Sequence, residues 1–113
     1  MRQVGVLAAA GLVAVREQLP ALARDHEVAA ELARALAEID GIAVDAPAIR
    51  TNMVMIDTSV SGLSANDVAR RLAEDGIKAS ARPPWTIRFV THRETGIAEV
   101  ERLVDSLRRI VPA

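Results

Sequence analysis

One arginine stands in the middle of the most strand-like stretch of the sequence. Residues 84–92 read PWTIRFVTH, a run rich in β-branched and aromatic side chains. Side chains alternate between the two faces of a strand, so Ile87 and Phe89 share one face and Arg88 lies on the other. A guanidinium is costly to bury without an anion, and it holds a planar carboxylate well through two parallel hydrogen bonds. Either Arg88 binds a substrate carboxylate, or it is a solvated arginine on the wet face of an edge strand.

Few other residues could do chemistry. The neighbours Asp25 and His26 are either an acid/base pair or a polar pair satisfied locally or across a domain boundary. The chain has no cysteine, and His26 lies far from His92, so neither disulfides nor metal-ligand spacing is present in the sequence. We therefore predict no metal site.

The length and the charge of the chain limit which class of protein it can be. With 113 residues, half of them apolar, the chain is long enough for one folded domain with a modest core. The 14 basic and 15 acidic residues give a net charge of -1, which offers no general attraction to nucleic acid or to an anionic membrane. The uncharged run 4–15 is too short to span a bilayer and shows no clear cleavage site. We expect a cytoplasmic protein.

The elements that position these residues begin with two helices. Residues 3–18 predict a helix that is apolar on every side, and such a helix must be buried against another domain or subunit. Pro20 fits the first turn of a second helix that runs to about residue 39 and ends before Gly41.

Short strands follow. Residues 42–44 and 77–80 are candidate strands, besides the strand that carries Arg88. Residues 53–57 are apolar on both faces, which predicts a central strand.

Two further helices carry clear end signals. Ser64 is a predicted N-cap, and Gly76 is predicted to stop that helix. Gly96 is predicted to cap the last helix, with Glu99 near its start. The fold class is α+β: a small mixed or antiparallel sheet of three to four strands, backed by helices and preceded by a long N-terminal helical segment. Residues 1–40 form that segment, and 41–113 form the sheet unit.

Five runs, in this order and at this spacing, resemble the C-terminal part of low-specificity L-threonine aldolases. They are MRQ at 1–3, LAAAGL at 7–12, DH at 25–26, TNMV at 51–54 and IRFVTH at 87–92. The resemblance covers essentially the whole chain. It implies a pyridoxal-phosphate enzyme with the aspartate-aminotransferase type of fold, which cleaves L-threonine, L-allo-threonine and similar β-hydroxy-α-amino acids to glycine and an aldehyde. It also implies a homotetramer, a dimer of dimers with active sites built across the subunit interface.

The same resemblance implies roles for two arginines. Arg88 matches the arginine that holds the substrate α-carboxylate, and Arg2 matches one near the cofactor phosphate, contributed from the neighbouring subunit. The family's cofactor-binding lysine belongs to a large domain that would precede Met1, and Lys78 does not match it. We therefore expect a C-terminal fragment that is inactive alone. Two alternatives stay open: a stand-alone α+β module that binds an amino acid through Arg88, and an interaction protein whose first helix docks a partner.

Overall fold

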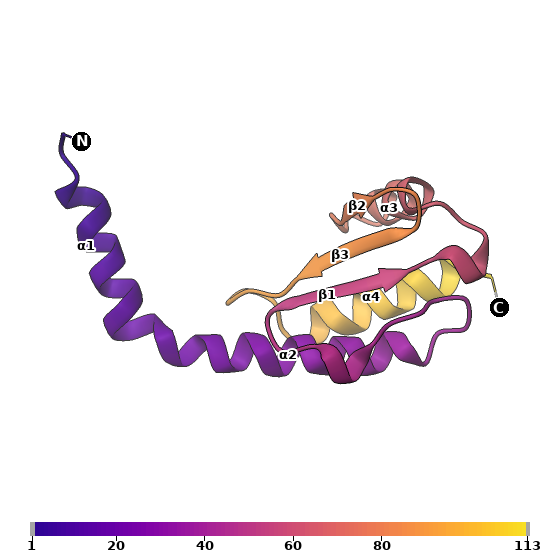
Figure 1. Cartoon of the computed structure of the whole chain (residues 1–113), viewed down its shortest axis with the longest axis horizontal. Helices are drawn as coiled ribbons and strands as arrows, with labels where there is room; N and C mark the ends of the chain where they lie inside the picture. The colour runs from indigo at the N-terminus through magenta and orange to yellow at the C-terminus, as the bar shows by residue number, and fades with distance from the viewer. Residues whose placement is uncertain (1, 113) are drawn as a thin grey trace.

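The chain begins with one long, bent helical segment (Figure 1). The computed structural model describes residues 2–112, so Met1 of the MRQ run and Ala113 lie outside it. Helix α1, Gly5–Val13, continues through a π-helical turn, Ala14–Gln18, into α2, Leu19–Ala37. Pro20 lies in the first turn of α2, as predicted, and it has no N–H to donate to the preceding turn. The π-helical turn and this proline account for the bend.

Helix α1 has no cover among residues 2–112. None of its residues is buried, Leu7 is 64% exposed, and Figure 1 shows the helix projecting away from the sheet. The continuous helix Gly5–Ala37 is long and apolar enough to cross a membrane. Helices that are covered by other protein meet the same criteria of length and composition. The prediction concerned the run 4–15 alone; the structure extends this run into a longer helix, which reaches the length needed to span a bilayer.

Helix α2 carries the core on one side. Its buried apolar residues are Val28, Ala29, Leu32, Ala33 and Leu36. It packs against β1, Met53–Asp57, and against α4, Ile97–Ile110. Helix α3, Ala65–Glu74, packs against α4 and the strands, so the three helices cover one face of the sheet.

The sheet has three antiparallel strands in the order β1-β3-β2, where β2 is Ser80–Arg82 and β3 is Thr86–Val90. The α+β prediction is confirmed. The prediction that 53–57 is central was wrong, because β1 lies at an edge and β3 is central. Met53 and Met55 point to the face that the helices leave open, where they are 42% and 45% exposed. The apolar pattern of β1 therefore reflects a face that this chain does not cover.

Two other strand predictions need correction. Residues 42–44 contribute only a single bridge, between Ala43 and Asp57. The strand predicted at 77–80 begins only at Ser80. Ile77 cannot extend it, because its N–H donates to the carbonyl of Leu72 and so belongs to the end of α3.

The predicted helix ends are confirmed. Ser64 caps α3, and its Oγ accepts from the backbone N–H of Asp67 at 3.1 Å. Gly76 follows α3 with φ +75°, the left-handed conformation that favours glycine. The backbone N–H of Gly96 donates to Oε2 of Glu99 at 2.8 Å at the start of α4.

Candidate functional site

Arg88 lies at the centre of the open sheet face. On the central strand β3 it stands opposite Met55 of β1 and Ser80 of β2. Its neighbours Ile87 and Phe89 are buried on the helix side, which confirms the predicted alternation. The edge-strand interpretation of Arg88 is wrong, because β3 has a partner on each side at this position.

The guanidinium of Arg88 is not satisfied by the described part of the chain. The side chain is half-buried, and its Nε is buried with no hydrogen-bond partner. None of the ion pairs among residues 2–112 involves Arg88. A buried donor left unpaired costs about 1–3 kcal/mol. Arg88 therefore has a donor without an acceptor among the described residues, and a carboxylate is the acceptor that suits a guanidinium best.

The surroundings of Arg88 are mostly apolar. The open face around it carries Met53 and Met55 on β1 and Val90 on β3, all exposed. Ser80 lies beside it on β2. If another part of the protein covered this face, the low dielectric would strengthen an ion pair formed there.

The end of β3 is fixed by contacts that are distant in sequence. The hydroxyl of Thr91 donates to the backbone carbonyl of Asp25 at 2.7 Å. The backbone N–H of Thr91 donates to the carbonyl of Asn52 at 2.8 Å, and Nδ2 of Asn52 donates to the carbonyl of Thr91 at 2.9 Å. The runs at 25–26, 51–54 and 87–92 thus meet three residues beyond Arg88.

This contact favours a structural role for the Asp25 position. Thr91 binds the backbone carbonyl of Asp25, not its carboxylate, and His26 is exposed. This contact uses the backbone of Asp25 only, so both interpretations of the Asp25 and His26 side chains stay open.

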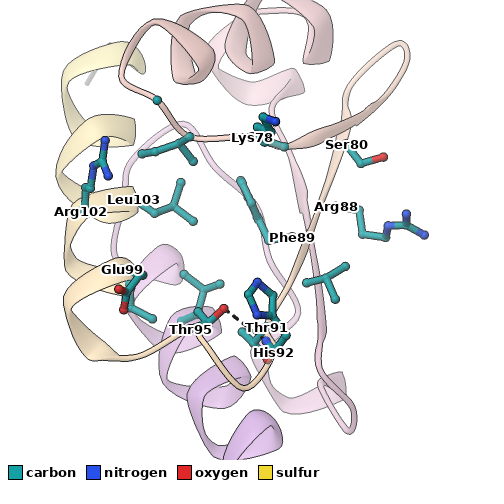
Figure 2. Close-up of a pocket in the computed structure, with 16 residues that line it drawn as sticks. Lys78, Ser80, Arg88, Phe89, Thr91, His92, Thr95, Glu99, Arg102 and Leu103 are labelled. Carbon is teal, nitrogen blue, oxygen red and sulfur yellow. Dashed lines mark hydrogen bonds between the residues drawn. The ribbon is translucent and has the colours of Figure 1, made fainter. Parts of the chain in front are cut away.

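A cavity of about 730 Å³ lies beside the end of β3 (Figure 2). Its walls come from segment 76–79, from α4 and from β3. Lys78, Arg102 and Glu99 line it, and the guanidinium of Arg88 points away from α4. The hydrogen bond from the Gly96 backbone holds the pKa of Glu99 below its ordinary value. Sequence reasoning missed this cavity, because the strand predicted at 77–80 would have closed it.

Arg2 and Arg88 are not brought together within the chain. Arg2 is exposed in the turn before α1, at the far end of the bent helix (Figure 1). Lys78 is exposed on the segment between α3 and β2.

Comparison with known proteins gives a family match and two curated relatives. The family model described as beta-eliminating lyase matches residues 1–59. Low-specificity L-threonine aldolase 1 of Arabidopsis thaliana is 41% identical over 101 residues, which cover 88% of this chain and 28% of the relative. Probable low-specificity L-threonine aldolase 2 of the same plant is 32% identical over 111 residues, covering 97% of this chain and 31% of the relative. The chain thus spans about three-tenths of the length of these curated relatives.

Solved structures share the fold. The aminotransferase TlmJ from Streptoalloteichus hindustanus matches with a TM-score of 0.70 at 19% identity, over 88% of this chain and 34% of that one. The structure of MppP soaked with the product 2-ketoarginine matches with a TM-score of 0.58 at 18% identity, over 81% and 27%. At this level of identity the likeness supports the fold alone, and it agrees with the expected aminotransferase type.

Proposed function

The chain belongs to the beta-eliminating lyase family, and we propose that it is the carboxylate-binding small domain of a pyridoxal-phosphate-dependent threonine aldolase. The whole enzyme would cleave L-threonine, L-allo-threonine and similar β-hydroxy-α-amino acids to glycine and an aldehyde. One observation carries the proposal: the buried, unpartnered Nε of Arg88 at the centre of an uncovered sheet face. Both curated relatives are named as threonine aldolases, which supports the same reaction.

The residues present fit the substrate side of such a site. The free donor of Arg88 suits the carboxylate of an amino acid. Arg2 would hold the cofactor phosphate of a neighbouring subunit, and its distance from the sheet along the bent helix supports a contact outside its own subunit. We assign covalent attachment of the cofactor to a lysine outside these residues, because Lys78 does not match the family's lysine. When bound, pyridoxal phosphate supplies an electron sink for the carbanion that forms as the Cα–Cβ bond breaks.

In this proposal, the described chain orients the substrate for the reaction. A two-pronged grip by Arg88 on the carboxylate restricts rotation of the substrate about Cα, and so determines which bond of Cα is presented for cleavage. Met55 and Val90 flank the grip, and their apolar side chains would keep water away from the ion pair. Thr91 and Asn52 hold the end of the strand that carries Arg88.

The uncovered helix α1 and the open sheet face indicate where other parts of the enzyme would bind. We infer that residues 1–40 lie at the interface with the large domain or another subunit, and that 41–113 form the small domain. Arg16 and Glu17 interrupt the apolar segment at the bend, which favours protein over lipid as the cover of α1. We propose that the enzyme is a homo-oligomer, a dimer of dimers, in which other subunits would cover α1. We also propose that it lies in the cytoplasm.

The direct test is Arg88→Ala in the full-length enzyme. Loss of one side of a carboxylate pair in a dry site costs about 2–5 kcal/mol, or about 30- to several-thousand-fold in kcat/KM for threonine. Arg82→Ala is the matched control, because Arg82 is an exposed arginine on the neighbouring strand β2. An Arg88→Ala enzyme within about twofold of the parent, as expected for a solvated surface arginine, would remove Arg88 from the site.

A further inference from the structure

We propose a second anion site in the cavity between α4 and the free end of β3, one that binds a small amphipathic carboxylate. The site goes beyond the proposed aldolase function. Arg88 also lines this cavity, but its guanidinium points away from α4, and the proposed site uses the side of the cavity that α4 and segment 76–79 form.

The cavity exists because β2 is short. Strand β2 pairs with β3 only as far as the Ser80 and Arg88 pair. Segment 76–79 then turns away, since the N–H of Ile77 is bound to the carbonyl of Leu72. The space of about 730 Å³ that this leaves lies within the range of roughly 300–1,000 Å³ that holds small ligands.

The inner wall of the cavity is apolar. Phe89 of β3, Leu103 and Val100 of α4, and Leu32 of α2 line it, and each belongs to the hydrophobic core. An aliphatic or aromatic body of a ligand would bury its surface against these side chains.

The rim is basic. Lys78 and Arg102 both line the cavity (Figure 2). Lys78 forms no ion pair among the described residues, and Arg102 is held in place by donating to the carbonyl of Asp75 at 2.5 Å. Glu99 is the carboxylate on this rim, and it is already bound to the N–H of Gly96. His92 accepts at Nδ1 from the N–H of Glu94. The charge balance therefore favours an anion.

The free end of β3 adds a backbone donor. The N–H of Thr91 points toward β1, because it donates to the carbonyl of Asn52. Successive residues of a strand direct their backbone groups to opposite sides, so the N–H of Val90 points toward the cavity. No described hydrogen bond joins Val90 to Lys78, and this donor is available to the ligand carboxylate.

The test is a titration of the ¹⁵N-labelled 113-residue chain with 4-phenylbutanoate, followed by amide NMR shifts, with the exposed Leu7 and Leu12 of α1 replaced by Gln so that self-association through that helix does not mask binding. The neutral 4-phenylbutanamide serves as a matched probe. We expect saturable shifts centred on Lys78, Ala79 and Leu103, which lie on the side of the cavity away from the open sheet face. We also expect the carboxylate to bind about three- to fivefold more tightly than the amide, as one half-exposed charge pair allows.

Variants separate the cavity from other surfaces. Lys78→Met should reduce the affinity for the carboxylate to that for the amide, whereas Arg50→Met, which removes an exposed charge outside the cavity, should change it by less than about twofold. Ala79→Phe should fill the cavity and abolish binding of both probes, with unchanged shifts in α2 showing that the fold survives. Equal affinity for the two probes, or an unaffected Lys78→Met variant, would overturn the proposal. Shifts centred on α1 would overturn it too. So would shifts centred on Met55 and Arg88, although these would support the carboxylate site on the open face.

Discussion

The hydroxyl of Thr91 donates to the backbone carbonyl of Asp25 at 2.7 Å, although the two residues lie 66 positions apart. Thr91 is buried and follows the strand that carries Arg88. Asp25 lies on α2, the helix that continues into the uncovered α1. This bond therefore ties the strand that carries Arg88 to the long N-terminal helical segment.

Thr91→Val should destabilise the chain by about 0.5–1.5 kcal/mol, because it removes the buried hydrogen bond from the Thr91 hydroxyl to the carbonyl of Asp25. Denaturant unfolding followed by circular dichroism measures this change. Thr91→Ser is the control, since it keeps the hydroxyl, and it should recover most of the loss. If Thr91→Val and Thr91→Ser are equally stable, the bond does not contribute.

Arg88→Lys should restore only part of the activity that Arg88→Ala loses in the full-length enzyme. An ammonium keeps the charge but cannot make two parallel hydrogen bonds to a carboxylate. Amino-alcohol analogues without the carboxylate provide the control: they should bind weakly to the parent and lose little more in either variant. Full recovery of kcat/KM in Arg88→Lys would show that charge alone is sufficient.

Arg2→Ala should loosen cofactor binding in the full-length enzyme while the assembly persists. A charge-assisted hydrogen bond to phosphate contributes about 1.5–3 kcal/mol. Its loss should raise the cofactor dissociation constant by about tenfold or more. Titration of the apoenzyme with cofactor, together with sedimentation, measures both properties. Arg50→Ala removes another exposed arginine and is the control. An unchanged dissociation constant would exclude Arg2 from the phosphate site.

The isolated 113-residue chain should self-associate through α1. Its exposed apolar side chains form a surface larger than monomers normally leave in water. Replacing Leu7 and Leu12 by Gln should shift the chain toward monomer in analytical ultracentrifugation. Val60→Gln is the control, because Val60 is 73% exposed on a separate surface. A clean monomer for the parent chain at high concentration would contradict this prediction.

Asp75 should make folding stability depend on acid pH. Hydrogen bonds from the Ser106 hydroxyl and from Nη2 of Arg109, the latter at 3.0 Å, hold the pKa of Asp75 below its ordinary value of 3.8. A carboxyl with a lowered folded-state pKa stabilises the fold above its unfolded pKa, and this contribution is lost as pH falls through the folded value. Thermal unfolding between neutral pH and about pH 2 should therefore lose less stability in Asp75→Asn than in the parent. Asp105→Asn, at an exposed position of α4, should leave the parent's pH dependence unchanged.

The sequence by itself determined what depends on neighbouring residues. Ser64 and Gly96 indicated the helix starts, because a cap is formed within one turn of its own helix. The alternation of Ile87 and Arg88 followed from strand geometry alone. The five motif runs likewise indicated a resemblance to threonine aldolases, and the comparisons with known proteins confirmed that resemblance.

Only the tertiary structure decided which strand is central and where the cavities lie. Met53 and Met55 read as core residues, but an apolar pattern does not tell whether the second face is covered by the same chain or by another part of the protein. The strand order depends on pairings between segments far apart in sequence, such as Met55 with Arg88. The cavity beside Lys78 depends on the partner of one donor. The N–H of Ile77 closes the end of α3 instead of extending β2, and the local sequence pattern does not tell which of these partners it takes.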